Sequence, residues 1–143
     1  MINNLRFELS FKDLFQLEEK LNFCKLKRIN NINIPCKGHI KKKLYNSSID
    51  YINKNHEKFN VVYHYSLYHQ YSKNKENSYQ NFLNFYKNCN SSNNSEILLV
   101  SGSIKKKNYD VIKVLNYLKN EKDLQNQLGI AYNPYLKNTL IFL

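Results

Sequence analysis

EILLVSGSIKKKNYD, residues 96–110, is the stretch that decides the fold. An apolar run of strand-forming residues ends at Ser101, Gly102 and Ser103, three lysines follow, and a helical pattern begins at Asn108. A short apolar run that ends in small polar residues and leads into a helix predicts one βα unit. The turn between strand and helix could hold a phosphate or a cofactor, or could be an ordinary loop.

The same alternation of strand and helix runs along the whole chain of 143 residues. Strands are expected at residues 5–10, 29–35, 60–66, 96–101 and 128–133. Helices are expected to begin at Ser10 to Asp13, at Ser47 or Ser48, near Asn77 and at Asn108. This spacing predicts a single α/β domain over residues 1–143, with a parallel sheet built from about five βα units. Two architectures remain open, part of a (βα)8 barrel with strands in sequential order and an open doubly wound sheet.

The formal net charge is +11, from 22 lysines and arginines against 11 acidic residues. A polyanion such as nucleic acid is one partner that this charge suggests. However, the chain also contains 24 asparagines and many lysines, isoleucines and tyrosines, as AT-rich codon bias would produce. A solvated basic surface is therefore the preferred interpretation, and nucleic-acid binding is not expected.

The chain is expected to be a soluble cytoplasmic protein. Its start has no basic segment followed by an apolar one, and no apolar run approaches the length of a membrane span. The cysteines are Cys24, Cys36 and Cys89, an odd number without CxxC spacing, which is typical of free thiols in a reducing compartment. Cys24 and Cys89 fall on apolar helix faces and are expected in the core.

Polar residues stand where the predicted strands end, and ligands of parallel α/β proteins bind at those carboxyl ends. The residues at these ends include Glu8, Ser10, Asn33, His64, Tyr65, Ser66, Ser101, Gly102, Ser103, Tyr132, Asn133 and Tyr135. A carboxylate at Glu8 is costly in a buried strand unless it is paired or used, but Glu8 could also face outward on an edge strand beside Arg6. His64 could bond a cofactor or substrate, or could be a core histidine bonded to a backbone carbonyl.

Several common site motifs are absent. The sequence has no GxGxxG or Walker glycine loop and no GxSxG elbow. The histidines show no HxH or HExxH spacing, so a metal site is not expected.

The order FELS, NINIP, VVYHYS, LLVSGS and AYNPY resembles the first five βα units of the methylenetetrahydrofolate reductase family, which are flavin-dependent (βα)8 barrels. The resemblance implies that Glu8 is the catalytic general acid toward a folate nitrogen. It also implies that FAD is held by His64, Ser66, Ser101, Gly102, Ser103 and Tyr132. A folate-like or other anionic small molecule would be the substrate.

The chain departs from this family in three places. The proline pair that follows the catalytic glutamate is absent, Ser103 stands where the family has a flavin-binding aspartate, and the chain stops about three βα units short of a full barrel. A divergent, truncated oxidoreductase of one-carbon metabolism, with weak or lost activity and a degenerate FAD site, is therefore the first hypothesis.

Two other classes of function remain open. One is a non-catalytic basic module that binds nucleic acid or another polyanion through the lysines at 41–43 and 105–107. The other is an assembly partner, in which the open sheet edge of an incomplete barrel pairs with another chain.

Overall fold

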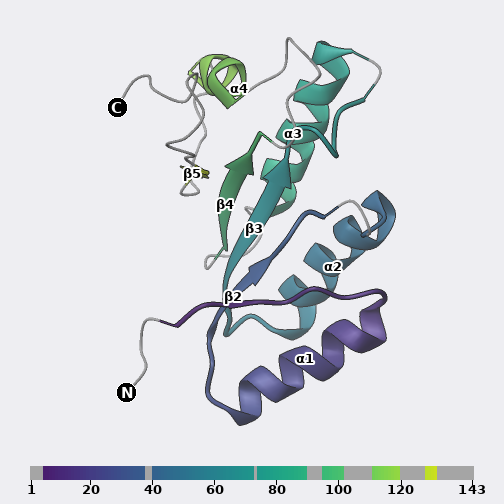
Figure 1. The fold of residues 1–143 in the computed structure, drawn as a ribbon, viewed down its shortest axis with the longest axis vertical. Coiled ribbons are helices and arrows are strands. Elements are labelled where there is room, and N and C mark those ends of the chain that lie inside the picture. The colour runs from purple at the N-terminus through teal and green to yellow at the C-terminus, as the bar shows by residue number, and fades with distance from the viewer. Residues whose placement is uncertain are drawn as a thin grey trace.

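The computed structural model describes residues 5–37, 40–72, 74–89, 95–101, 111–119 and 128–131. Over these residues the chain is an α/β protein with one five-stranded parallel sheet (Figure 1). Its strands are β1 (Phe7–Glu8), β2 (Asn31–Ile34), β3 (Asn60–Ser66), β4 (Ser95–Val100) and β5 (Leu128–Ile130). Its helices are α1 (Leu14–Leu26), α2 (Lys42–Asn55), α3 (Lys75–Cys89) and α4 (Val111–Leu118).

The strands lie in the order β1-β2-β3-β4-β5, and every neighbouring pair is parallel. The predicted α/β class and the sequential strand order are confirmed. A doubly wound sheet reverses its strand order near the middle, whereas the described strands show no reversal. The order among them is therefore the one that a partial barrel predicts.

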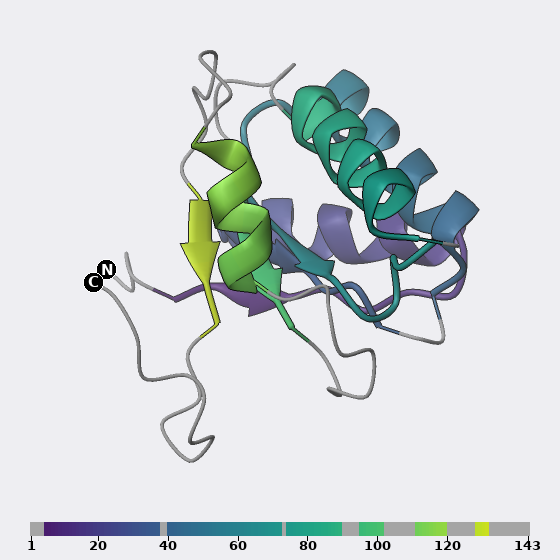
Figure 2. The same ribbon diagram turned by 90° about the horizontal axis from the view of Figure 1, so that it is seen from above.

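The two faces of the sheet differ in what covers them. Ile32, Ile34, Val61, Tyr63 and Tyr65 alternate along β2 and β3 on the buried face. Figure 2 shows α1, α2 and α3 together on one side of the sheet, and α4 adds Val114 and Leu118 to the same core cluster. This face supplies the hydrophobic core.

We call the opposite side of the sheet the open face. Cα partners place Glu8, Asn33, Val62 and Glu96 in one row across β1 to β4, and alternation adds His64 further along β3. Of this set, Glu8 is exposed and the others are half-buried. A purely parallel sheet is normally covered on both faces, so the open face is where this fold can present polar side chains to a ligand.

α1 begins at Leu14 with Asp13, not Ser10, as its N-cap, because the Asp13 side chain accepts a hydrogen bond from the Gln16 backbone N–H at 2.8 Å. The helix is apolar on both sides. Leu17, Leu21 and Cys24 are buried, as predicted for Cys24, while Phe15 is 74% exposed, and Phe23 and Leu26 are exposed as well.

α2 begins at Lys42, so the predicted start at Ser47 or Ser48 is wrong. The Ser48 hydroxyl donates to the Tyr45 carbonyl one turn earlier, which lets a serine sit inside a helix instead of capping it. α3 begins at Lys75, close to the predicted start, with Asn74 accepting a bond from the Asn77 N–H. Its residues Phe82, Phe85, Tyr86 and Cys89 are buried, as the apolar spacing predicted.

No described helix is both long and apolar enough to cross a membrane.

Candidate functional site

The candidate site lies on the open face at the carboxyl ends of β1, β2 and β3. Glu8 ends the edge strand β1, is exposed, and forms an ion pair with Lys37, which follows β2. Arg6 is not the partner of Glu8, because its guanidinium donates to the backbone carbonyls of Ile32 and Asn60. Glu8 is therefore an exposed residue of an edge strand, as in the alternative interpretation, but its partner is Lys37 and not Arg6.

Asn33 and His64 bring two unpartnered polar atoms to this end of the open face. Asn33 is the Cα partner of Glu8 on one side and of Val62 on the other, and His64 lies two residues beyond Val62. The Asn33 Oδ1 and His64 Nε2 atoms are buried and have no hydrogen-bond partner among the described residues. Buried polar atoms without partners are rare, and they indicate places where a ligand or water can bond.

The electrostatics of His64 tie it to Glu8 and Lys37. Burial lowers the pKa of His64 from its ordinary 6.5, the charge of Glu8 raises it, and the charge of Lys37 lowers it again. The net direction is downward, so the imidazole is neutral near pH 7. A neutral ring offers one nitrogen as donor and the other as acceptor.

The structure places Glu8 and His64 on the same face, which the active-site hypothesis required. Ser66 differs, because it is 2% exposed and its Oγ accepts a bond from the His69 N–H, which favours a structural role in the turn after β3. Ser101 directly follows β4 and is half-buried. Gly102, Ser103 and Tyr132 lie outside the described residues.

The lysine clusters are described only in part. Lys41, Lys42 and Lys43 are exposed where α2 begins. The lysines at 105–107 lie outside the described residues, so the predicted joint cluster stays a prediction.

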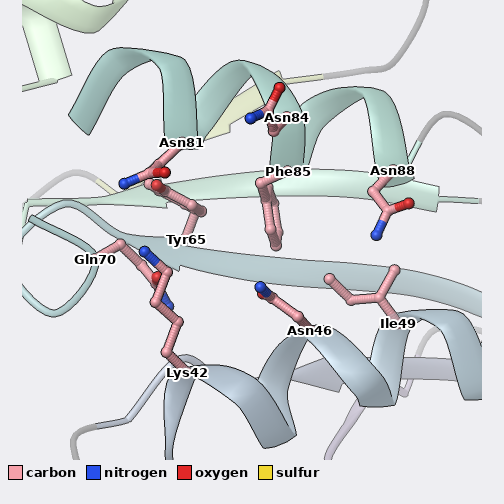
Figure 3. Close-up of a pocket in the computed structure, with 9 residues that line it drawn as sticks. All are labelled: Lys42, Asn46, Ile49, Tyr65, Gln70, Asn81, Asn84, Phe85 and Asn88. Atoms are coloured by element: carbon pink, nitrogen blue, oxygen red, sulfur yellow. The ribbon is translucent and has the colours of Figure 1, made fainter. Parts of the chain in front are cut away.

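Sequence reasoning missed a hollow between α2 and α3 of about 200 Å³ (Figure 3). Amide side chains dominate its lining, together with Lys42 and the rings of Tyr65 and Phe85. The amides are those of Asn46, Gln70, Asn81, Asn84 and Asn88. Small-molecule pockets usually exceed about 300 Å³, so this hollow is a weaker candidate than the strand ends. None of the residues predicted for the flavin site lines it, and Lys42 is the one member of the predicted lysine cluster at 41–43 that does.

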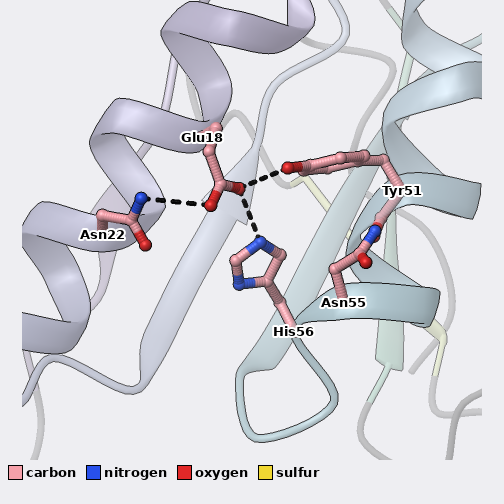
Figure 4. Close-up of polar contacts among 5 residues, drawn as sticks. All are labelled: Glu18, Asn22, Tyr51, Asn55 and His56. Atoms are coloured by element: carbon pink, nitrogen blue, oxygen red, sulfur yellow. Dashed lines mark hydrogen bonds and ion pairs between the residues drawn. The ribbon is translucent and has the colours of Figure 1, made fainter.

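Sequence reasoning also missed a polar network between α1 and α2 (Figure 4). Glu18 accepts hydrogen bonds from the Tyr51 hydroxyl at 2.5 Å and from the Asn22 amide at 3.0 Å. The Nε2 atom of the buried His56 lies 2.8 Å from Glu18 Oε2. The Tyr51 hydrogen bond is the largest cause that lowers the pKa of Glu18 below 4.5; burial opposes it, and His56 adds to it. The network joins two helices and contains no described group of metal ligands.

Replacing Glu18 with glutamine is expected to reduce the fall in the free energy of unfolding that occurs as the pH is lowered. A carboxyl with a lowered pKa in the folded state stabilises the protein above its ordinary pKa of 4.5. That contribution is lost as the pH falls through the lowered pKa. Urea unfolding between about pH 6 and pH 3 should therefore show a smaller fall in the free energy of unfolding for E18Q than for the wild type. The exposed Glu19 on the same helix is the control, and an E19Q profile as flat as that of E18Q would contradict this assignment.

Comparison of the chain with protein-family models, with curated proteins and with solved structures gives no match to any of them.

Proposed function

We propose that the carboxyl ends of β1, β2 and β3 bind a small polar ligand on the open face. The observation that carries this proposal is the pair of buried, unpartnered atoms, Asn33 Oδ1 and His64 Nε2, beside the Glu8–Lys37 ion pair. A ligand that bonds both atoms would satisfy them, and the ion pair would orient its polar edge.

The specific ligand that we propose is a flavin, as the resemblance to the methylenetetrahydrofolate reductases implies. The pyrimidine edge of a flavin alternates hydrogen-bond donors and acceptors, which suits an amide oxygen and an imidazole nitrogen that both lack partners. When bound, a flavin supplies hydride transfer. The chain's own contribution would be to hold it with Asn33 and His64 and to keep Lys37 near its polar edge.

The role of Glu8 decides between a binding protein and an enzyme. A general acid has to be free to reach the atom it protonates, whereas the Glu8 carboxylate is engaged in an ion pair with Lys37. This pairing supports ligand binding more strongly than proton donation to a folate nitrogen. We therefore propose a flavin-binding protein of the reductase type with weak activity at most. We place it in the cytoplasm, where its free cysteines would stay reduced.

The test is a titration of FAD and of FMN with the full chain, followed by the quenching of flavin fluorescence. Replacing His64 with alanine is expected to weaken binding by about tenfold, because the ligand loses one hydrogen bond in a buried setting. His69, an exposed histidine in the turn after β3, is the matched control, and H69A should bind as the wild type does. Absence of quenching by the wild type, or equal loss in H64A and H69A, would contradict the proposal.

A further inference from the structure

A second hollow, of about 780 Å³, lies at the opposite end of the sheet, where β2 and β3 begin. We call it the basal hollow. Its walls come from the carboxyl ends of α1 and α2 and from the turns that follow them. The lining residues are Lys25, Arg28, Asn30, Lys54, Asn55, His56, Glu57, Lys58 and Phe59. Its volume is within the range of about 300–1,000 Å³ that is usual for small-ligand sites.

The basal hollow has an excess of positive charge. Four of its lining side chains are cations and one is a carboxylate, Glu57. The two ion pairs found among the described residues, Lys37–Glu8 and His56–Glu18, involve none of these four cations. Lys25 and Lys54 stand in the last turns of their helices, where a cation complements the helix dipole. Arg28 and Lys58 lie beyond the helix ends, so the dipoles do not account for them.

Arg28 occupies a backbone position that usually belongs to glycine or asparagine. Its φ is 56°, in the left-handed region, and its N–H donates to the Lys25 carbonyl to close the end of α1. A side chain other than glycine or asparagine is uncommon at such a position. The Arg28 guanidinium therefore lies at the basal hollow although the left-handed backbone conformation is less favourable for arginine than for glycine. It is also the cation best shaped to grip an oxyanion with two parallel hydrogen bonds.

His56 supplies a second, independent indication of a ligand. It is 4% exposed and is one of the lining residues of the basal hollow, whose four cations are exposed. Its Nε2 atom is engaged by Glu18, but its buried Nδ1 atom has no hydrogen-bond partner among the described residues. Buried polar atoms without partners are rare, and this one belongs to a residue that lines the same hollow as four exposed cations, as expected where an anion or an ordered water binds.

We propose that the basal hollow binds a small ligand carrying several phosphate groups, with Arg28 and Lys58 as its main contacts. Phosphate offers the oxygens that a guanidinium and ammonium groups bind best. The cations surround a concave space, so they suit a compact anion better than an extended strand. Phe59 is 4% exposed and offers no ring on which a base could stack, which disfavours single-stranded nucleic acid. This site is separate from the flavin site, and neither proposal depends on the other.

The experiment titrates inorganic tripolyphosphate into the full chain at low salt and follows the heat of binding. The test variant carries both R28G and K58Q, which removes the two main contacts. Glycine adopts the left-handed backbone conformation at residue 28 without strain, so this variant is expected to fold. We expect about tenfold or more weaker binding and an unchanged or higher unfolding temperature. The control is K12Q with K43Q, which removes two exposed lysines outside the basal hollow and should change affinity little.

ATP and a single-stranded RNA complete the set of probes. Equal affinities for ATP and tripolyphosphate would support recognition of phosphate alone, and tighter binding of ATP would support a nucleotide as its source. Absence of binding by tripolyphosphate, or equal losses in the two double variants, would overturn the proposal. The proposal would also be overturned if the RNA bound more tightly than tripolyphosphate and if this RNA binding were lost in the R28G and K58Q double variant.

Discussion

Replacing Phe82 with alanine is expected to lower the free energy of unfolding by about 3–5 kcal/mol. Phe82 is fully buried on α3, with its ring edge-on to Tyr65 at 5.1 Å between centroids and 6.2 Å from Tyr86. These large, stiff neighbours cannot collapse fully into the space that the ring leaves, so the cavity cost adds to the lost burial. Urea unfolding, with an unchanged dependence on denaturant, measures this loss.

Phe15 provides the matched control for this experiment. The same change of phenylalanine to alanine removes a ring that is 74% exposed on the outer side of α1. We expect a change within about 0.5 kcal/mol. Losses of similar size in F82A and F15A would show that the assignment of inner and outer helix faces is wrong.

Replacing Tyr45 with phenylalanine is expected to cost about 1–3 kcal/mol, although only one oxygen is removed. β2 ends at Ile34, which is the Cα partner of Tyr63, so β3 continues past the end of its neighbour. There the Tyr45 hydroxyl donates to the His64 carbonyl at 2.5 Å. Burial raises the pKa of Tyr45 well above 10, so the hydroxyl keeps its proton at every pH at which the fold is studied. Phenylalanine would leave this carbonyl without that donor.

The control for Tyr45 is Tyr117, which is 37% exposed on α4 and stacks on Tyr79. Removal of its hydroxyl should change the thermal unfolding temperature little, because water replaces any lost bond. Equal shifts in Y45F and Y117F would contradict a special role for the buried hydroxyl.

The strands were predictable because their sequences are rich in strand-forming residue types and alternate between buried and less buried positions. NVVYHYS combines β-branched and aromatic residues with alternating burial, and β3 covers the predicted residues 60–66. The start of α2 was not predictable in the same way. Serine is the usual capping residue, yet at Ser48 its hydroxyl bonds a carbonyl inside the helix, and α2 begins without any side-chain cap. Local sequence does not distinguish these two uses of serine.

The candidate site was predictable where it depends on strand register and not where it depends on loops or helix packing. Asn33 and His64 follow from the rule that parallel strands present their carboxyl ends together. Lys37 could not be assigned, because it follows a strand in an irregular segment whose path the sequence does not indicate. His56 and Glu18 meet only when α1 packs against α2, and a sequence pattern reports one helix face at a time.

The sequential strand order bears on how the chain folds during synthesis. Each strand of the described sheet pairs only with the strands that come immediately before and after it in the chain. A newly made βα unit can therefore dock on the units already formed, and no later segment has to be inserted between two earlier ones. The sheet grows at one edge as the ribosome advances, and that edge is the surface at risk of aggregation until the next strand arrives. A slow stretch of translation after β3 would prolong the exposure of this edge.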